Sequence, residues 1–157
     1  MSEIQTVTGD LLDQPVEVIV NAWNRNFIPW WLLLPQGVSG AIKRRGGHAP
    51  FRELARCGML AEGEARLTGA GRLPFRGIIH VAALNLFWRS SPEIIRAGVR
   101  NALALASEQR FGSVALPLIG AGTGGVPPEV AQAVIGEAAG QSPYSGRVVV
   151  VVFGHGA

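Results

Sequence analysis

Three runs of aliphatic and β-branched residues constrain the fold of this chain more than any other feature. They are VEVIVNA at 16–22, SVALPLI at 113–119 and RVVVVVF at 147–153. A run without polar alternation is typical of a strand buried on both faces, and such strands occur in parallel sheets covered by helices. Helical patterns alternate with these runs. The sequence therefore predicts an α/β fold, a three-layer α/β/α sandwich whose central sheet is mixed and largely parallel.

The remaining elements follow from shorter patterns. The clearest helix opens at Ser91-Pro92-Glu93 and continues to about Glu108, with proline and a carboxylate in its first turn. Its expected inward stripe is Ile94, Ile95, Val99, Leu103 and Leu105. The other expected elements are an edge strand at 4–8, a short helix at 40–45 capped by Ser39 and ended by Gly46-Gly47, a helical piece at 51–55, two strands within 63–84, and a helix from 127 that turns Val130, Val134 and Ile135 inward.

Length and composition indicate one domain, covering residues 1–157. The chain has 157 residues, 48% of them hydrophobic, which suits a single core. The first residues show no secretion signal, and the longest apolar run, Phe27 to Pro35, is shorter than the roughly 20 residues of a membrane span. We therefore expect a soluble, cytoplasmic protein with no membrane partner. Cys57 is alone, so we expect a small buried thiol and neither a metal site nor a disulfide.

Nearly all of the basic residues are arginines. A single lysine, Lys43, accompanies thirteen arginines, and the net charge is +3. Guanidinium groups bind phosphate in a two-pronged geometry, which points to a phosphate-bearing partner. The alternative is that arginines only cover solvated faces, and for Lys43 we expect a solvated side chain.

A glycine-rich segment carries the strongest single indication of a ligand. LIGAGTGGVPPE at 118–129 lies between a predicted buried strand and a predicted helix. Glycines allow positive φ and a close approach to a ligand, and a helix start offers N–H groups to an anion. This segment is a candidate phosphate cradle, although it lacks the Lys-Ser/Thr of a Walker loop. The alternative is a tight turn without a ligand.

Polar side chains follow two of the predicted strands. Asp10 could accept a hydrogen bond from the exocyclic amine of a base, or it could cap its own turn. Asn21 and Asn24 could bind sugar hydroxyls, or they could hold loop backbone. Capping is the expected role of Ser39.

Taken in order, these segments resemble the macrodomain family, the ADP-ribose-binding (Appr-1''-p processing) fold. The matching segments are Gly9-Asp10, VNAWN at 20–24, GVSGAI at 37–42, IHV at 79–81 and LPLIGAG at 116–122. They extend over nearly the whole chain. The chain also resembles, more distantly, bacterial macrodomain enzymes that remove ADP-ribose from DNA bases.

The resemblance implies ADP-ribose as ligand and assigns roles to particular residues. Asp10 would bind the adenine amine and Phe153 would stack on the ring. The 119–125 loop and Gly37-Val38 would hold the diphosphate through backbone N–H groups. Asn24, with Ser39, would position water at the distal ribose. The full predicted set is Gly9, Asp10, Leu11, Asn21, Ala22, Asn24, Gly37, Val38, Ser39, Pro117, Ile119, Gly120, Ala121, Gly122, Thr123, Gly124, Gly125 and Phe153.

The implied activity is hydrolysis of ADP-ribosyl linkages on a modified macromolecule, DNA or protein, without a cofactor. Ser39 stands where the hydrolytic relatives that act on protein carboxylates have aspartate, and serine is a weak base. A reader module that binds ADP-ribose without turnover is therefore the first alternative. The second is a single-stranded nucleic-acid-binding domain, in which Trp23, Trp30, Trp31 and Trp88 stack on bases. A monomer is the default oligomeric state.

The segment NAWNRNFIPWWLLLPQGVSG, residues 21–40, joins the expected ribose and diphosphate contacts. We expect Trp30→Ala or Trp31→Ala to change the preference among ADP-ribosylated substrates, because these rings would contact the group attached to the distal ribose. Rates on modified DNA and modified protein measure this change. Unchanged kinetics on every substrate would indicate that both tryptophans are core residues without a role in substrate choice.

Overall fold

A computed structural model describes residues 3–24, 37–58, 60–84, 89–121 and 125–153. Trp30, Trp31 and Trp88 lie outside these residues. In chain order the elements are β1 (Glu3–Gly9), the 3-10 helix η1 (Leu11–Asp13), β2 (Val18–Asn24), α1 (Gly37–Gly46), α2 (Ala49–Ala55), β3 (Ala65–Thr68), β4 (Gly77–Leu84), α3 (Pro92–Glu108), β5 (Ser113–Pro117), α4 (Pro128–Gln141) and β6 (Arg147–Phe153).

The strands form one six-stranded sheet in the order β1-β6-β5-β2-β4-β3. Every neighbouring pair is parallel except β3 and β4, which are antiparallel. The predicted mixed, largely parallel sheet is confirmed, and so is the expected edge position of the first strand. The two strands expected within 63–84 are β3 and β4.

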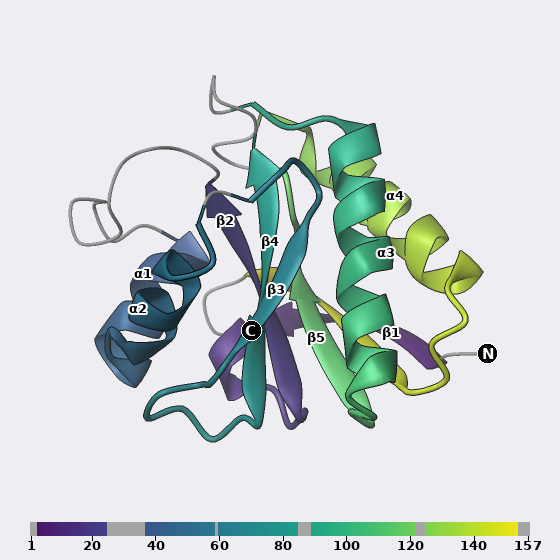
Figure 1. Cartoon of the computed structure of the whole chain (residues 1–157). Helices are drawn as coiled ribbons and strands as arrows, with labels where there is room; N and C mark the ends of the chain where they lie inside the picture. Colours follow the sequence, from purple (N-terminus) through teal and green to yellow (C-terminus); the bar gives the residue numbers. More distant parts are fainter. Residues whose placement is uncertain (1–2, 25–36, 59, 85–88, 122–124, 154–157) are drawn as a thin grey trace.

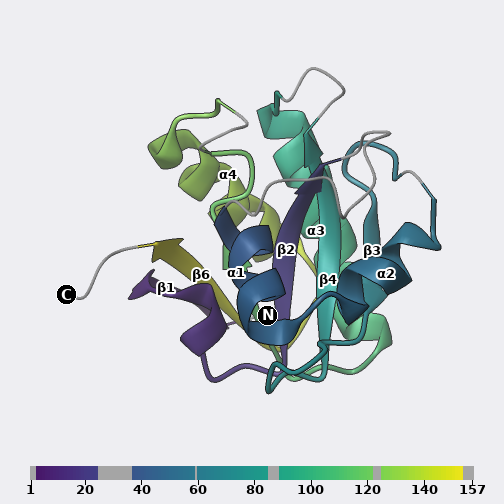
Figure 2. The ribbon, with the colours of Figure 1, turned by 90° about the vertical axis from the view of Figure 1, so that its left-hand side faces the viewer.

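Helices cover both faces of the sheet (Figure 1), as the three-layer prediction requires. α3 and α4 lie on one face, while η1, α1 and α2 lie on the other (Figure 2). Along β2, Val18 and Val20 pack in the core with α3 and α4, whereas Ile19 packs with α1 and α2. Both faces of the central strands are therefore apolar, which explains the unbroken β-branched runs.

The helices depart from the predicted details at four positions. α1 begins at Gly37, so Ser39 lies inside its first turn and is not the expected cap. In α3, Ile94 and Leu105 are only half-buried. The buried face of α3 consists of Ile95, Gly98, Val99, Ala102, Leu103 and Ala106. Val130 of α4 is 40% exposed, contrary to the expected inward position.

Two predictions about individual side chains are wrong. Cys57 is exposed, two residues after the end of α2. Lys43 is only 7% exposed, and its Nζ lies 4.9 Å from the centroid of the Phe51 ring. A cation over an aromatic face recovers part of the hydration that it loses, which allows a lysine to be buried here. Within the described ranges, no helix is long and apolar enough to cross a membrane.

The close packing of α3 on the sheet provides a test of this arrangement. A Cβ atom at Gly98 would lie 2.5 Å from Cγ1 of the buried Val81, whereas one at Gly136 of α4 would meet nothing within 4 Å. We expect Gly98→Ala to lower the free energy of unfolding by about 1–3 kcal/mol through overpacking. The control Gly136→Ala should raise it by about 0.5–1 kcal/mol. Urea unfolding of both variants checks the pair, and equal effects would contradict the packing.

Candidate functional site

The carboxyl ends of the parallel strands meet at one edge of the sheet. Gly9 at the end of β1 is paired with Phe153 at the end of β6, and Pro117 at the end of β5 is paired with Val151. β2 ends at Asn24. The segments that the sequence marks as candidate ligand contacts are far apart in the chain, and the fold therefore brings them to the same edge of the sheet.

The connections that follow β2 and β5 lead to opposite sides of the sheet. β2 pairs with β4 over its full length, but the pairs that it forms with β5 are Val18 with Val114 and Ile19 with Ala115, both near the amino end. From β2 the chain continues to α1 on one face, and from β5 it continues to α4 on the other (Figures 1 and 2). In open α/β sheets, ligands bind beyond the carboxyl ends of the strands at such a switch point.

The glycine-rich loop leaves β5 through tight turns. Ile119 N–H donates to the Pro117 carbonyl at 2.9 Å and Ala121 N–H to the Leu118 carbonyl at 3.2 Å. Gly120 has a φ of +86°, and a Cβ atom there would lie 2.6 Å from Ile95 Cδ1 and 2.9 Å from Ser90 Oγ. Both the backbone conformation and the space therefore require glycine at 120. Gly122, Thr123 and Gly124 lie outside the described residues.

The start of α4 supplies fewer N–H groups than the sequence suggested. Pro127 caps this helix and Pro128 is its first residue, and proline has no N–H. The N–H groups of Val130 and Ala131 already donate to the Pro127 carbonyl, at 3.0 and 2.9 Å. The expected anion contact at this helix start therefore relies on the Glu129 N–H and the helix dipole, and it stays a prediction. At α1, by contrast, the first turn contains no carboxylate and the last turn is basic.

Asp10 caps the turn that follows β1. Its Oδ1 accepts a hydrogen bond from Leu12 N–H at 2.9 Å, and its Oδ2 lies 3.9 Å from Arg45 Nη1. Arg45 Nη2 also donates to Asp13 Oδ1 at 3.0 Å. The two roles considered for Asp10 are compatible, because the cap uses one carboxylate oxygen. The neighbouring Leu11 is 5% exposed and packs in the core with α1, which leaves its backbone for any contact.

A chain of buried hydrogen bonds crosses β2, β4 and β3 beneath this edge. Asn21 Nδ2 lies 3.0 Å from His80 Nδ1, and His80 Nε2 lies 2.8 Å from Thr68 Oγ1. The Thr68 hydroxyl donates to the Gly69 carbonyl at 2.9 Å. Its single proton is thereby used, so it accepts from His80 Nε2–H. His80 is therefore neutral, with the proton on Nε2, and Nδ1 accepts from the Asn21 amide.

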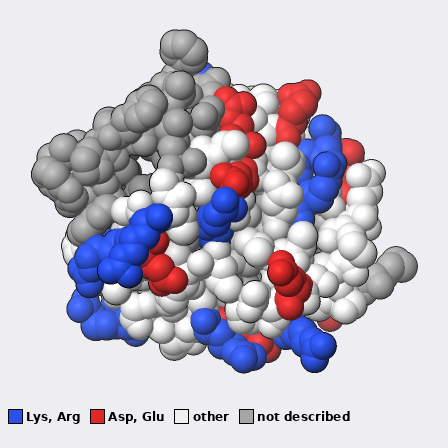
Figure 3. Space-filling view, viewed as in Figure 1, with Lys and Arg blue, Asp and Glu red and all other residues white. Residues whose placement is uncertain are grey.

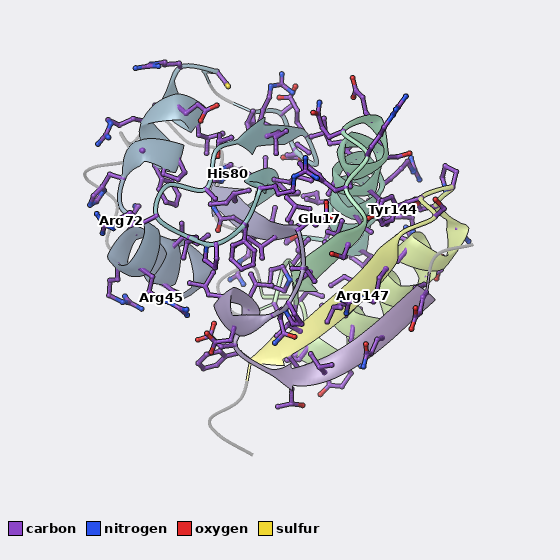
Figure 4. All side chains as sticks on the ribbon, turned by 90° about the horizontal axis from the view of Figure 1, so that it is seen from below. Glu17, Arg45, Arg72, His80, Tyr144 and Arg147 are labelled. Carbon is purple, nitrogen blue, oxygen red and sulfur yellow. The ribbon has the colours of Figure 1, made fainter. Side chains whose placement is uncertain are left out.

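The surroundings of His80 hold it in this neutral state. Its side chain is fully buried and lies among the strands in Figure 4. The Phe51 ring meets it edge-on at 5.6 Å between centroids. Burial lowers the pKa of His80 to about 3, because a low-dielectric interior disfavours the imidazolium. Burial also lowers the pKa of Lys43. Neither group is an accessible base.

Comparisons with known proteins agree with this geometry. The sequence pattern of the macro domain family matches residues 20–135. This chain belongs to the macro domain family. The match covers β2 through most of α4, and thus most of the segments gathered at the carboxyl edge of this macrodomain.

Relatives of this macrodomain occur in several bacteria. An uncharacterised protein of Aquifex aeolicus is 39% identical over 82% of this chain and 76% of its own. An uncharacterised protein of Mycobacterium tuberculosis is 35% identical over the whole of this chain, which spans only 43% of that protein.

Solved macrodomain structures superpose closely. The Oceanobacillus iheyensis macrodomain with ADP has a TM-score of 0.81 and 30% identity, covering 96% of this chain and 83% of that chain. A point mutant of the same macrodomain with ADPR has a TM-score of 0.76 and 29% identity, covering 96% and 84%.

The predicted site residues differ in their burial and in their place in the fold. Gly120 and Ile119 are buried, Ala22, Pro117 and Ala121 are half-buried, and Phe153 is 68% exposed at the end of β6. Asn21 is fully buried, so its side chain supports the edge from below. Asn24 ends β2, and Gly37, Val38 and Ser39 begin α1. The side chains of these four residues are not described.

Sequence reasoning missed three residues of this macrodomain. His80 entered only as part of a matching motif, Lys43 was expected in solvent, and Thr68 was not considered. The signal for His80 was a lone imidazole inside GIIHVAAL, an otherwise apolar strand at 77–84. A buried polar side chain in such a strand requires partners. The partners come from two other strands, so the sequence alone does not identify them.

The neutral state of His80 predicts an acid-sensitive fold. The pKa of His80 is about 3 in the folded chain against 6.5 for the unfolded residue, so the unfolded state binds more protons between these values. Stability is therefore full above pH 6.5 and is lost as the pH falls toward 3, by about 2 kcal/mol at pH 5. Urea unfolding at pH 7 and pH 5 measures the loss, with His80→Asn as control. An equal loss in this variant would contradict the assignment to His80.

Proposed function

We propose that this macrodomain binds ADP-ribose at the carboxyl edge of the sheet and hydrolyses ADP-ribosyl linkages. The observation that carries the proposal is the assembly, at one switch point, of the ends of β1, β2, β5 and β6 with the start of α1. Structures of a related macrodomain with ADP and with ADPR support the choice of ligand.

The proposed contacts follow the order of the strands. Asp10 accepts a hydrogen bond from the adenine amine through Oδ2, because Oδ1 is used by the cap. Phe153, the exposed last residue of β6, lies beside Gly9 in register and stacks on the adenine ring. The glycine loop and the first turn of α1 approach the diphosphate from β5 and from the opposite layer. Backbone N–H groups with a helix dipole are suited to this anion.

In the proposed reaction, water attacks the anomeric carbon of the distal ribose. The bond from that carbon to the macromolecule breaks, its electron pair leaves with the macromolecule, and a proton from water restores neutrality. Asn24 ends β2 at this position, and Asn21 lies on the same strand, held from below by His80. An oxocarbenium-like transition state needs electrostatic support and an oriented water more than a strong base.

A non-catalytic reader is the second candidate. It is favoured by the burial of His80 and Lys43, which lie on the α1 and α2 face of the sheet, and by Ser39 in place of a carboxylate. Titration calorimetry with ADP-ribose tests binding, and release of ADP-ribose from modified DNA and from modified protein tests turnover. Binding of ADP-ribose without its release from either substrate would favour the non-catalytic reader and exclude the hydrolase. Absence of binding would overturn both.

We expect Asn24→Ala to lower the rate of ADP-ribose release about 100-fold, the scale of losing a group that orients the nucleophile. The free energy of unfolding should change by less than about 1 kcal/mol, because Asn24 is the last residue of its strand. Single-turnover kinetics and urea unfolding measure the two quantities. A proportional loss of stability would show that Asn24 acts in folding.

A further inference from the structure

We infer that the outer surface of α1 and α2 binds the phosphate backbone of a nucleic acid, so the modified macromolecule of the proposed function is a nucleic acid. This inference rests on the proposed function for its substrate. We call this region the α1–α2 basic surface and define it by five exposed arginines. They are Arg44, Arg45, Arg52, Arg56 and Arg72.

Positive charge is concentrated in this layer of the molecule. Residues 37–57 together with Arg72 contain six basic side chains and one carboxylate, Glu53, whereas the rest of the chain contains eight basic and ten acidic residues. Asp10 and Asp13 at η1 belong to the same layer, and with them its net charge is +3, whereas the remainder of the chain is neutral. Lys and Arg side chains gather over the position of α1 and α2 (Figure 3). The chain's overall charge of +3 therefore belongs to this layer.

Most of these guanidinium groups are not used for ion pairs within the described structure. Arg45 is the exception, because it contacts Asp13 and Asp10. The ion pairs of the described residues include neither Arg44, Arg52, Arg56 nor Arg72. Glu53, the carboxylate within residues 37–57, accepts a hydrogen bond from the Gly69 backbone N–H at 2.9 Å. Surface arginines that form no ion pair in the described structure favour an anionic partner.

The geometry of the surface suits a chain of phosphates. Arg52 lies in α2 and Arg56, one turn later, is its C-cap residue with helical backbone angles, which places their Cβ atoms about 5–6 Å apart. The Arg72 guanidinium lies beside Gly47, between α1 and α2, with Nη1 3.4 Å from the position of a Cβ atom there. Figure 4 shows Arg72 and Arg45 on the same side of the molecule. A guanidinium binds a phosphate through two donors, and a nucleic-acid strand offers phosphates at regular intervals.

The position of the surface connects it to the proposed site. α1 begins at Gly37, beside the proposed diphosphate contact, and reaches Arg44 and Arg45 in its last turn. Its ten residues span about 15 Å. A strand whose modified nucleotide occupies the carboxyl edge can therefore follow α1 onto α2.

Two other anionic partners fit less well. A membrane surface requires apolar side chains that insert between lipids, and the large hydrophobic side chains exposed in the described structure are Ile4, Val130 and Phe153, which lie on β1, α4 and β6. An acidic protein surface supplies carboxylates, but without the regular spacing of a phosphate backbone. The acidic protein is the competing outcome in the test.

The test compares two double variants with equal changes in charge. Arg52→Gln/Arg56→Gln removes two charges from the α1–α2 basic surface, and Arg100→Gln/Arg110→Gln removes two exposed charges of α3 and the turn after it. Fluorescence anisotropy measures Kd for a single-stranded oligonucleotide carrying one ADP-ribosyl group, the same strand unmodified, and an acidic peptide carrying one ADP-ribosyl group. Calorimetry measures Kd for ADP-ribose alone, and circular dichroism checks the fold of each variant.

We expect the wild-type chain to bind both oligonucleotides, with log K falling against log salt at a slope of about −2 to −3 for three to four phosphates. Arg52→Gln/Arg56→Gln should make this slope shallower by about 1.4 and leave the Kd for ADP-ribose unchanged. The α3 control should leave the slope unchanged.

Three results would overturn the inference: no binding of the unmodified strand, an equal effect of the α3 control, or a preference for the acidic peptide. Failure of the proposed function is separate, because it appears as absence of binding to ADP-ribose alone. In that case, arginine-dependent binding of the unmodified strand would still support nucleic-acid binding by the α1–α2 basic surface.

Discussion

The unequal pairing of β2 determines where this molecule can bind a ligand. β2 is joined to β4 at every position of its length, but its pairs with β5 lie only at its amino end. A strand in the middle of a sheet normally has hydrogen-bonding neighbours on both sides, because unpaired backbone groups are costly to bury. The divergence therefore occurs at the carboxyl edge, where backbone groups can meet solvent or a ligand. The two strands that diverge there, β5 and β2, lead along the chain into the glycine loop and toward the start of α1.

The buried chain from Asn21 to Thr68 makes one side of this edge rigid. Three side chains from three strands satisfy each other, and the Thr68 proton fixes the direction of every bond in the chain. A buried polar network with all its groups satisfied specifies a single arrangement of the surrounding core. β2 is thus held from below at Asn21, three residues before the end of the strand at Asn24. The other side of the edge, with Gly120 at positive φ, is held by turns and by close packing on Ile95.

The sequence predicted the architecture well because the architecture depends on patterns. Unbroken β-branched runs identify the central strands, and Ser91-Pro92-Glu93 marks the start of α3, where Ser91 does accept a hydrogen bond from Ile94 N–H. Individual side chains were harder. Lys43 is buried because Phe51, eight residues later, covers its cation, and no local pattern contains that contact. Ser39 was wrongly predicted as a cap, since helix ends depend on one or two residues of backbone geometry. The site residues proposed at the carboxyl edge remain predictions, but the register that gathers their strands there is observed.

The pairing of β1 with β6 has a consequence for how the chain is made. The first strand of the sheet lies against the last over its whole length, from Glu3 with Arg147 to Gly9 with Phe153. During synthesis, β1 leaves the ribosome well before β6 and cannot pair with it until the residues between them have followed. Contacts so distant in sequence are slow to form. Until then β1 is an unpaired strand, and its mostly exposed, polar sequence EIQTVTG limits association with other chains.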